Sequence, residues 1–174
     1  SNFEEFIKMA ELIIKHSVQR EGTNEILTPY VLTIKKVAKV YNNKPSSRTS
    51  RSNQEKIVQW LEKLNPTILS EECFTTKIGE DEFEQASSKE FYYQNMVKSY
   101  EKIGQYEKCI LIGEEALEII KKFHYKNKIW ITGRILYSKC MISSNREIDF
   151  QNYKKFAEKE NYWFLWHKLA NICY

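Results

Sequence analysis

Cysteine and histidine are few and widely spaced in this sequence. The 174 residues include three scattered histidines, and the four cysteines stand more than thirty residues apart: Cys73, Cys109, Cys140 and Cys173. Zinc and redox sites usually draw on closely spaced pairs of such residues, so we expect neither a metal site nor a cofactor. Because the number of cysteines is even, they could also form two disulfides. We favour free thiols, because an aliphatic and aromatic core of this size does not need them.

Motifs that carry catalytic chemistry are missing as well. The sequence has no glycine-rich phosphate loop, no Gly-x-Ser-x-Gly and no zinc-deaminase spacing. The adjacent carboxylates Glu71-Glu72 and Glu114-Glu115 point to different sides of a helix, which disfavours paired acid and base chemistry. His124 fits a structural role at a helix end, where it can interact with the last carbonyls. We therefore expect a protein that is not an enzyme.

Long apolar runs are absent too. No stretch approaches the ~18 residues of a membrane span, and Glu4, Glu5 and Lys8 interrupt the apolar pattern of the N-terminus where a secretory signal would not. We expect no membrane association and a cytoplasmic location. With 42% hydrophobic and 14% aromatic residues, the chain has enough apolar surface for one compact core.

Charge is unevenly distributed, although the net charge is only +4. Residues 35–63 contain eight basic and two acidic residues, whereas residues 71–90 contain seven acidic and two basic ones. Binding to nucleic acid by charge alone usually requires a larger excess. The segment 35–56 still offers side chains that can contact phosphate or an acidic partner: Lys35, Lys36, Lys39, Arg48 and Arg51. For the two arginines, solvated loop charge is the simpler interpretation.

What the sequence does contain is helical periodicity almost throughout. Apolar residues spaced three or four apart predict an all-α fold of about eight helices. The expected ranges are 3–18, 30–41, 57–64, 87–103, 106–120, 129–141, 144–156 and 162 to the end. Residues 42–53 read as a loop. The acidic stretch 75–89 reads as a linker between an N-terminal helical subdomain, residues 1–74, and a second part, residues 90–174.

Several helix ends carry recognisable signals. Thr28 followed by Pro29 is typical of a helix start. Ser87 and Glu90 have the spacing of a capping box, and Ser144 and Glu147 have it again. Gly104 suits the left-handed residue that ends a helix.

Residues 90–120 resemble a tetratricopeptide repeat. The motif positions are matched by Tyr93, Met96, Tyr100, Gly104, Tyr106 and Ala116. Four residues differ from those that the motif usually has at their positions: Val97, Cys109, Gly113 and Lys121. A second, degenerate unit matches at Trp130 and Tyr137, and a third, truncated one begins at Trp163, close to the repeat length of 34 residues.

The resemblance implies stacked antiparallel helix hairpins that form a solenoid, with the aromatic Trp130 and Trp163 in the core between helices. It also implies a concave face, made by the first helix of each hairpin, that binds a protein or peptide. Gln94 and Lys98 occupy the positions of the clamp that binds C-terminal carboxylates, so we expect no such clamp and a larger folded or helical partner. The incomplete last repeat suggests that the chain belongs to a longer bacterial protein.

A second resemblance involves Phe123-His124-Tyr125-x-Asn127-x-Ile129-Trp130, together with Thr28-Pro29-Tyr30 and Trp163-Phe164. These residues look like the helical N-terminal region of bacterial multidomain proteins that act in conflict or phage defence. Such proteins often carry a nucleic-acid-binding module. The sequence thus favours a non-catalytic interaction domain, with an accessory nucleic-acid-binding domain that uses residues 35–56 as the alternative.

Overall fold

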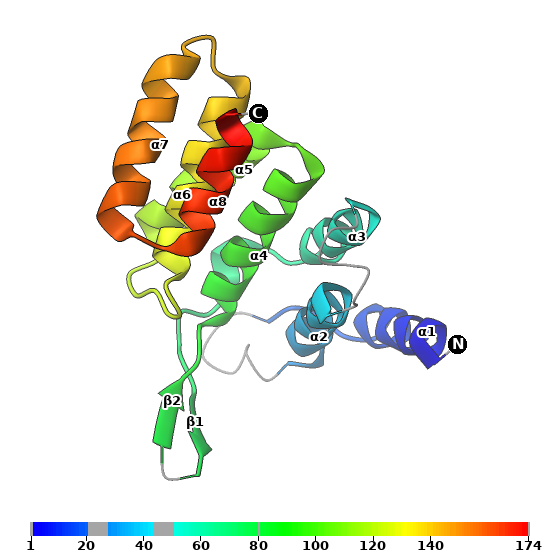
Figure 1. Ribbon diagram of the computed structural model, residues 1–174. Helices are drawn as coiled ribbons and strands as arrows, with labels where there is room; N and C mark the ends of the chain where they lie inside the picture. Colours follow the sequence, from blue (N-terminus) through cyan, green and yellow to red (C-terminus); the bar gives the residue numbers. More distant parts are fainter. Residues whose placement is uncertain (1, 21–27, 44–50, 80, 174) are drawn as a thin grey trace.

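The computed structural model describes residues 2–20, 28–43, 51–79 and 81–173. Within these residues, eight α-helices follow one another, and a β-hairpin lies between the third and the fourth (Figure 1). The helices are α1 (Asn2–Lys15), α2 (Pro29–Asn43), α3 (Arg51–Leu61), α4 (Ser88–Ile103), α5 (Tyr106–Ile119), α6 (Asn127–Ile142), α7 (Arg146–Glu160) and α8 (Trp163–Cys173). The all-α class predicted from the periodicity is confirmed.

The ends of α4 follow the signals in the sequence. The Ser87 hydroxyl oxygen accepts a hydrogen bond from the Glu90 N–H at 3.1 Å, and Gly104 ends the helix in the left-handed region at φ 78°. Glycine tolerates this conformation without a steric penalty. The capping box expected at Ser144 and Glu147 is wrong, because α7 begins after Asn145 and has no side-chain cap.

Other boundaries differ from the expectation. The first helix ends at Lys15 rather than 18, and Val18 is 65% exposed. The predicted loop over residues 42–53 is wrong at both ends: α2 extends to Asn43, and α3 begins at Arg51. Its middle, with Arg48, lies outside the described residues.

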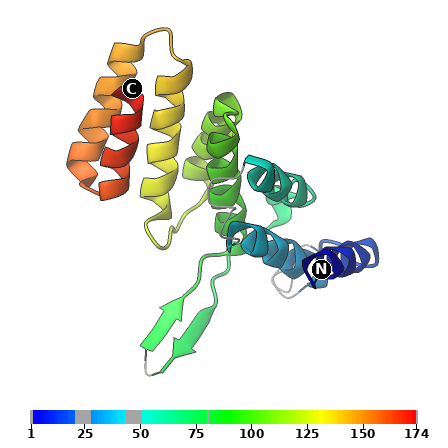
Figure 2. The ribbon, with the colours of Figure 1, turned by 45° about the vertical axis from the view of Figure 1, so that its right-hand side comes forward.

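The stretch interpreted as an acidic linker contains the hairpin. Strands β1 (Thr75–Ile78) and β2 (Asp81–Glu84) pair antiparallel, with Thr76 opposite Phe83. Gly79 adopts φ +67° in the turn, which favours glycine. The hairpin projects away from the helices in both ribbon views (Figure 1 and Figure 2). Strands this short, with mostly exposed side chains, have too little alternation to be recognised in the sequence.

Consecutive helices pack against one another along the chain, and α4 with α6 and α6 with α8 are in contact as well. One cluster of buried apolar residues runs from Ala10 on α1 to Ile135 on α6. A second cluster joins α6, α7 and α8 and includes Tyr153 and Leu165. The helices before and after the hairpin therefore share a continuous core. None of the described helices combines the length and the apolar character needed to cross a membrane.

Candidate functional site

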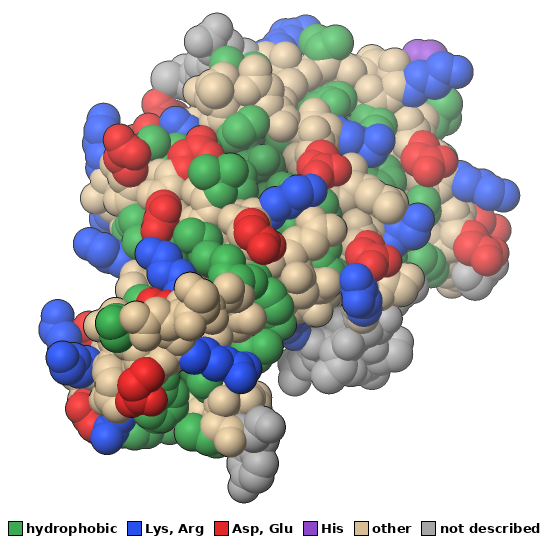
Figure 3. Space-filling view, turned by 90° about the horizontal axis from the view of Figure 1, so that it is seen from above, with side chains coloured by type: hydrophobic (Ala, Val, Ile, Leu, Met, Phe, Trp, Pro, Cys, Tyr) green, Lys and Arg blue, Asp and Glu red, His purple; other side chains and the backbone are tan. Residues whose placement is uncertain are grey.

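An open groove of about 690 Å³ lies where α2, α4 and α6 face the segment before α4 and the loop before α6. Four of the side chains that line it are cationic: Lys35, Lys39, Lys98 and Arg134. None of the described lining residues is acidic. By contrast, basic and acidic side chains are interspersed on the face of the molecule in Figure 3. The groove therefore differs from that face, because all the charged side chains among its described lining residues are cationic.

The lysines on α2 are oriented by contacts with α4. Lys35 and Lys39 place their ammonium groups 5.4 Å and 5.8 Å from the centre of the Phe91 ring, within the range of cation–π attraction. Lys35 also donates to the Ser88 hydroxyl at 3.2 Å. These contacts hold both cations along one wall of the groove.

Lys98 belongs to a chain of polar contacts between α2 and α4. Its ammonium donates to the side-chain carbonyl of Asn42 at 2.8 Å, and the Asn42 amide donates to Asn95 at 2.9 Å. The chain fixes the position of Lys98 relative to the two lysines on α2.

Arg134 is anchored by a buried carboxylate. Glu101 on α4 accepts from Arg134 on α6 and, at 2.6 Å, from Lys168 on α8. Burial on its own would raise the pKa of Glu101, but the charges of Arg134 and Lys168 outweigh burial and hold that pKa below its ordinary value. Burial is also the largest cause that lowers the pKa of Lys168. One carboxylate thus joins three helices behind the groove and faces two cations.

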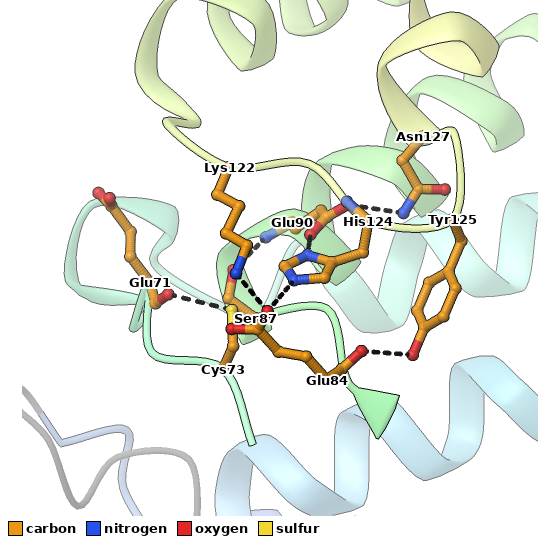
Figure 4. A network of polar contacts seen from close by, with 9 residues as sticks. All are labelled: Glu71, Cys73, Glu84, Ser87, Glu90, Lys122, His124, Tyr125 and Asn127. Atoms are coloured by element: carbon orange, nitrogen blue, oxygen red, sulfur yellow. Dashed lines mark hydrogen bonds and ion pairs between the residues drawn. The ribbon is translucent and has the colours of Figure 1, made fainter. Parts of the chain in front are cut away.

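A second polar network holds the loop that closes one end of the groove (Figure 4). The Glu90 side chain has no exposed surface, and its carboxylate accepts from the His124 backbone N–H at 2.7 Å and from the Asn127 amide at 2.8 Å. The Tyr125 hydroxyl donates to the Glu84 carbonyl at 2.9 Å. Tyr125 and Lys126 adopt positive φ, a conformation that such contacts must stabilise. His124 was expected at a helix end, but it lies in this loop, between the end of α5 at Ile119 and the start of α6 at Asn127.

The aromatic rings of the groove already have partners within the molecule. Trp130 stacks on Phe164 with ring centres 3.4 Å apart and planes 11° apart. The Arg134 guanidinium lies 5.6 Å from the centre of the Trp130 ring. Phe91 faces two ammonium groups, as described above. Among the aromatic lining residues, Tyr125 is the exposed one, at 62%.

The structure brings together only part of the predicted basic segment. Lys35 and Lys39 reach the groove, whereas Lys36 lines a separate apolar hollow between α1 and α2. Arg51 lies on the exposed first turn of α3 and pairs with Glu55 at 3.1 Å. Arg48 is outside the described residues. Residues 35–56 therefore supply two of the four groove cations.

The residues that match the repeat motif have mixed outcomes. Tyr93, Met96, Tyr100 and Ala116 are buried. Tyr106 and Tyr137 are half-buried and meet edge to face at 6.3 Å. Trp130 is half-buried, partly in the core and partly in the groove. The core position predicted for Trp163 is wrong: it is 76% exposed, because the next two residues, Phe164 and Leu165, take the buried positions of that turn.

The sequence reasoning missed Phe91 and Arg134 as groove residues. Phe91 sits three residues before Gln94, and Arg134 sits four after Trp130, so both share a helix face with a residue that was singled out. This spacing is the signal in the sequence from which the two groove residues could have been predicted. No protein-family model matches the chain, and neither a curated protein nor a solved structure matches it.

Proposed function

We propose that this protein is a non-catalytic helical-repeat interaction domain that binds an acidic segment of a partner protein in the groove between α2, α4 and α6. The observation that carries the proposal is the lining of that groove: four cations from three helices, with no acidic residue among its described lining residues. Charge complementarity of this kind selects anionic partners and speeds their association.

The order of the helices supports a tetratricopeptide-like arrangement. In a solenoid of helix hairpins, the first helices of successive hairpins line the inner face. Here every second helix, α2, α4 and α6, contributes to the groove, and α4 and α6 are in direct contact. Gln94 and Lys98, which stand at the clamp positions of the repeat, both line it.

Two features favour a peptide over a nucleic acid. Binding of single strands relies on aromatic rings on which bases can stack. Phe91 and Trp130 already face cations or Phe164, which leaves Tyr125 as the exposed ring among the described lining residues. The side-chain amides of Gln85, Gln94 and Asn127 line the groove, and amides suit the donors and acceptors of a peptide backbone. We therefore favour an acidic peptide segment, and a nucleic acid is the alternative that the experiment distinguishes.

The test is a fluorescence-anisotropy titration of the chain with a labelled peptide that alternates glutamate and apolar residues. A matched peptide with glutamine in place of glutamate, and a single-stranded oligonucleotide, are titrated in parallel at low and high salt. We expect the acidic peptide to bind tightest. Lys39→Gln and Lys98→Gln should each weaken its binding about tenfold, which corresponds to about 1.4 kcal/mol.

Lys36→Gln is the matched control, because it removes the same charge from the same helix outside the groove. Equal loss from Lys36→Gln and Lys39→Gln would contradict the proposal, since binding would then depend on charge in general. Tighter and strongly salt-dependent binding of the oligonucleotide would favour the nucleic-acid alternative.

A further inference from the structure

Three side chains that are distant in the sequence converge at the base of the hairpin. Cys73 precedes β1, Glu84 ends β2, and His124 lies in the loop between α5 and α6. One sulfur, carboxylate or imidazole ligand atom of each lies within 4.8 Å of those of the other two. Figure 4 shows the three side chains pointing toward one another. A thiol, a carboxylate and an imidazole are the side chains that bind Zn²⁺ in proteins.

His124 is oriented for such a role. Its side chain is 8% exposed, and its Nδ1 lies 2.7 Å from Glu90 Oε2. The Glu90 carboxylate accepts, so Nδ1 donates to it, and whenever the imidazole is neutral its lone pair is on Nε2. Metal-bound histidines usually donate their second ring N–H to a carboxylate in this way.

The Nε2 atom of His124 makes no hydrogen bond in the described structure, although it lies beside Glu84. It is buried and has no hydrogen-bond partner, and a buried polar atom without a partner is costly. Glu84 Oε2 lies 3.4 Å from Nε2. This buried lone pair aimed at a carboxylate and a thiol is an observation independent of the clustering itself.

We propose that Cys73, Glu84 and His124 bind a divalent transition-metal ion, and that Zn²⁺ is the ion that this donor set fits best. Three protein ligands leave a fourth tetrahedral position for water. Cys73 and Glu84 also help to line a hollow of about 300 Å³. The proposal concerns a site separate from the groove and does not depend on the peptide-binding function.

Binding requires small movements and the loss of one proton. One sulfur, one nitrogen and one oxygen around tetrahedral zinc lie roughly 3.3–3.5 Å apart, as follows from Zn–S of about 2.3 Å and Zn–N of about 2.0 Å. His124 Nε2 and Glu84 Oε2 are already 3.4 Å apart, so the required movement is mainly that of the Cys73 sulfur, which lies within 4.8 Å of both. Burial, followed by the charge of Glu84, raises the pKa of the Cys73 thiol. The metal displaces that proton to water and binds the thiolate.

Lys122 competes with the ion. Its ammonium pairs with the Glu84 carboxylate, so it must move away, or keep only the second oxygen, when Glu84 binds metal. A cation beside the site also repels the ion. Lys122→Gln should consequently tighten metal binding, whereas loss of a ligand weakens it.

A bound ion joins the hairpin to the loop between α5 and α6. That loop supplies Tyr125 to the groove, and Asn127, the first residue of α6, follows it. Metal binding therefore stabilises the folded chain, because the ligands are brought together only in the folded state. The bound ion thus ties the base of the hairpin to this loop.

The test is a titration of the chelator-treated, reduced chain with Co²⁺, which reports tetrahedral coordination and thiolate ligation by its absorption. We expect one equivalent to produce intense visible bands and a thiolate-to-cobalt charge-transfer band, which one equivalent of Zn²⁺ then removes. Zn²⁺ should also raise the midpoint of thermal unfolding. Glu90→Gln, which alters the carboxylate that orients His124, should weaken Co²⁺ binding about 10- to 100-fold.

Two cysteine variants decide where the metal binds. Cys73→Ser should remove the charge-transfer band and weaken binding by more than Glu90→Gln does. Cys173→Ser, which alters an exposed thiol on α8, should leave the band and the affinity unchanged. Circular dichroism checks that both variants keep the helical fold; the half-exposed position of Cys73 outside the helices makes its substitution mild. Absence of a stoichiometric band, or a band that persists in Cys73→Ser, would overturn the proposal.

Discussion

Glu101 on α4 and Arg134 on α6 form an ion pair in which neither side chain exposes more than 11% of its surface. Lys168 on α8 joins the same carboxylate at 2.6 Å. Arg134 also lines the groove, and the three residues come from α4, α6 and α8. The contribution of this ion pair to the free energy of unfolding therefore reports on the packing of the helices and on the position of Arg134.

Glu101→Gln should strongly destabilise the protein. The substitution removes the only carboxylate that Arg134 and Lys168 share among the described contacts, and leaves buried positive charge uncompensated. Breaking such a pair typically costs about 3–5 kcal/mol. The free energy of unfolding in urea measures the effect. Glu114→Gln, which breaks an exposed pair with Lys139, should cost less than about 1 kcal/mol, and similar losses in both variants would contradict the assignment.

The same carboxylate predicts a dependence of stability on pH. The pKa of Glu101 in the folded protein lies below its ordinary value of 4.5, so the folded state favours the charged form. Its contribution is present above about pH 4.5 and is lost as the pH falls toward the folded-state pKa. We expect the free energy of unfolding to decrease over that window, and to decrease less in Glu101→Gln. Parallel pH profiles for the two proteins would show that another group is responsible.

Ala116→Leu should destabilise the packing of α5. Ala116 has no exposed surface, and the resemblance to a tetratricopeptide repeat predicts a close approach of two helices at this position. Overpacking of such a site costs roughly 1–3 kcal/mol. Ala170→Leu, at an exposed position of α8, serves as the control and should change stability by less than about 0.5 kcal/mol. A neutral Ala116→Leu in thermal unfolding would contradict the repeat register.

Much of the helical framework could be predicted from the sequence, because local signals determine it. Ser87 and Gly104 bound α4 as expected, since a side-chain cap and a left-handed residue act on their own backbone neighbourhood. Gly113, which departs from the repeat motif, is explained instead by the packing of one helix against another. A Cβ there would lie 2.6 Å from Ile135 Cγ1 on α6, so glycine permits the close approach of α5 and α6.

The candidate sites were less accessible to sequence reasoning. The groove joins side chains from α2, α4 and α6, and no local pattern shows that Lys39, Lys98 and Arg134 face the same space. Cys73, Glu84 and His124 are 11 and 40 residues apart, and the hairpin that brings Glu84 beside Cys73 was not recognised. We expected no metal site because the cysteines and histidines are far apart in the sequence. The fold nevertheless brings Cys73, Glu84 and His124 close together in space.

The groove is the central claim, and side-chain NMR tests it most directly. The four tryptophans give separate indole N–H signals: Trp60, Trp130, Trp163 and Trp166. Trp130 lines the groove, whereas Trp60 lies on α3 and Trp163 is exposed on α8. On titration with the glutamate-rich peptide, we expect the Trp130 signal to shift in proportion to binding while the Trp60 and Trp163 signals stay in place. A shift of Trp163 or Trp60 with Trp130 unchanged would contradict binding in the groove.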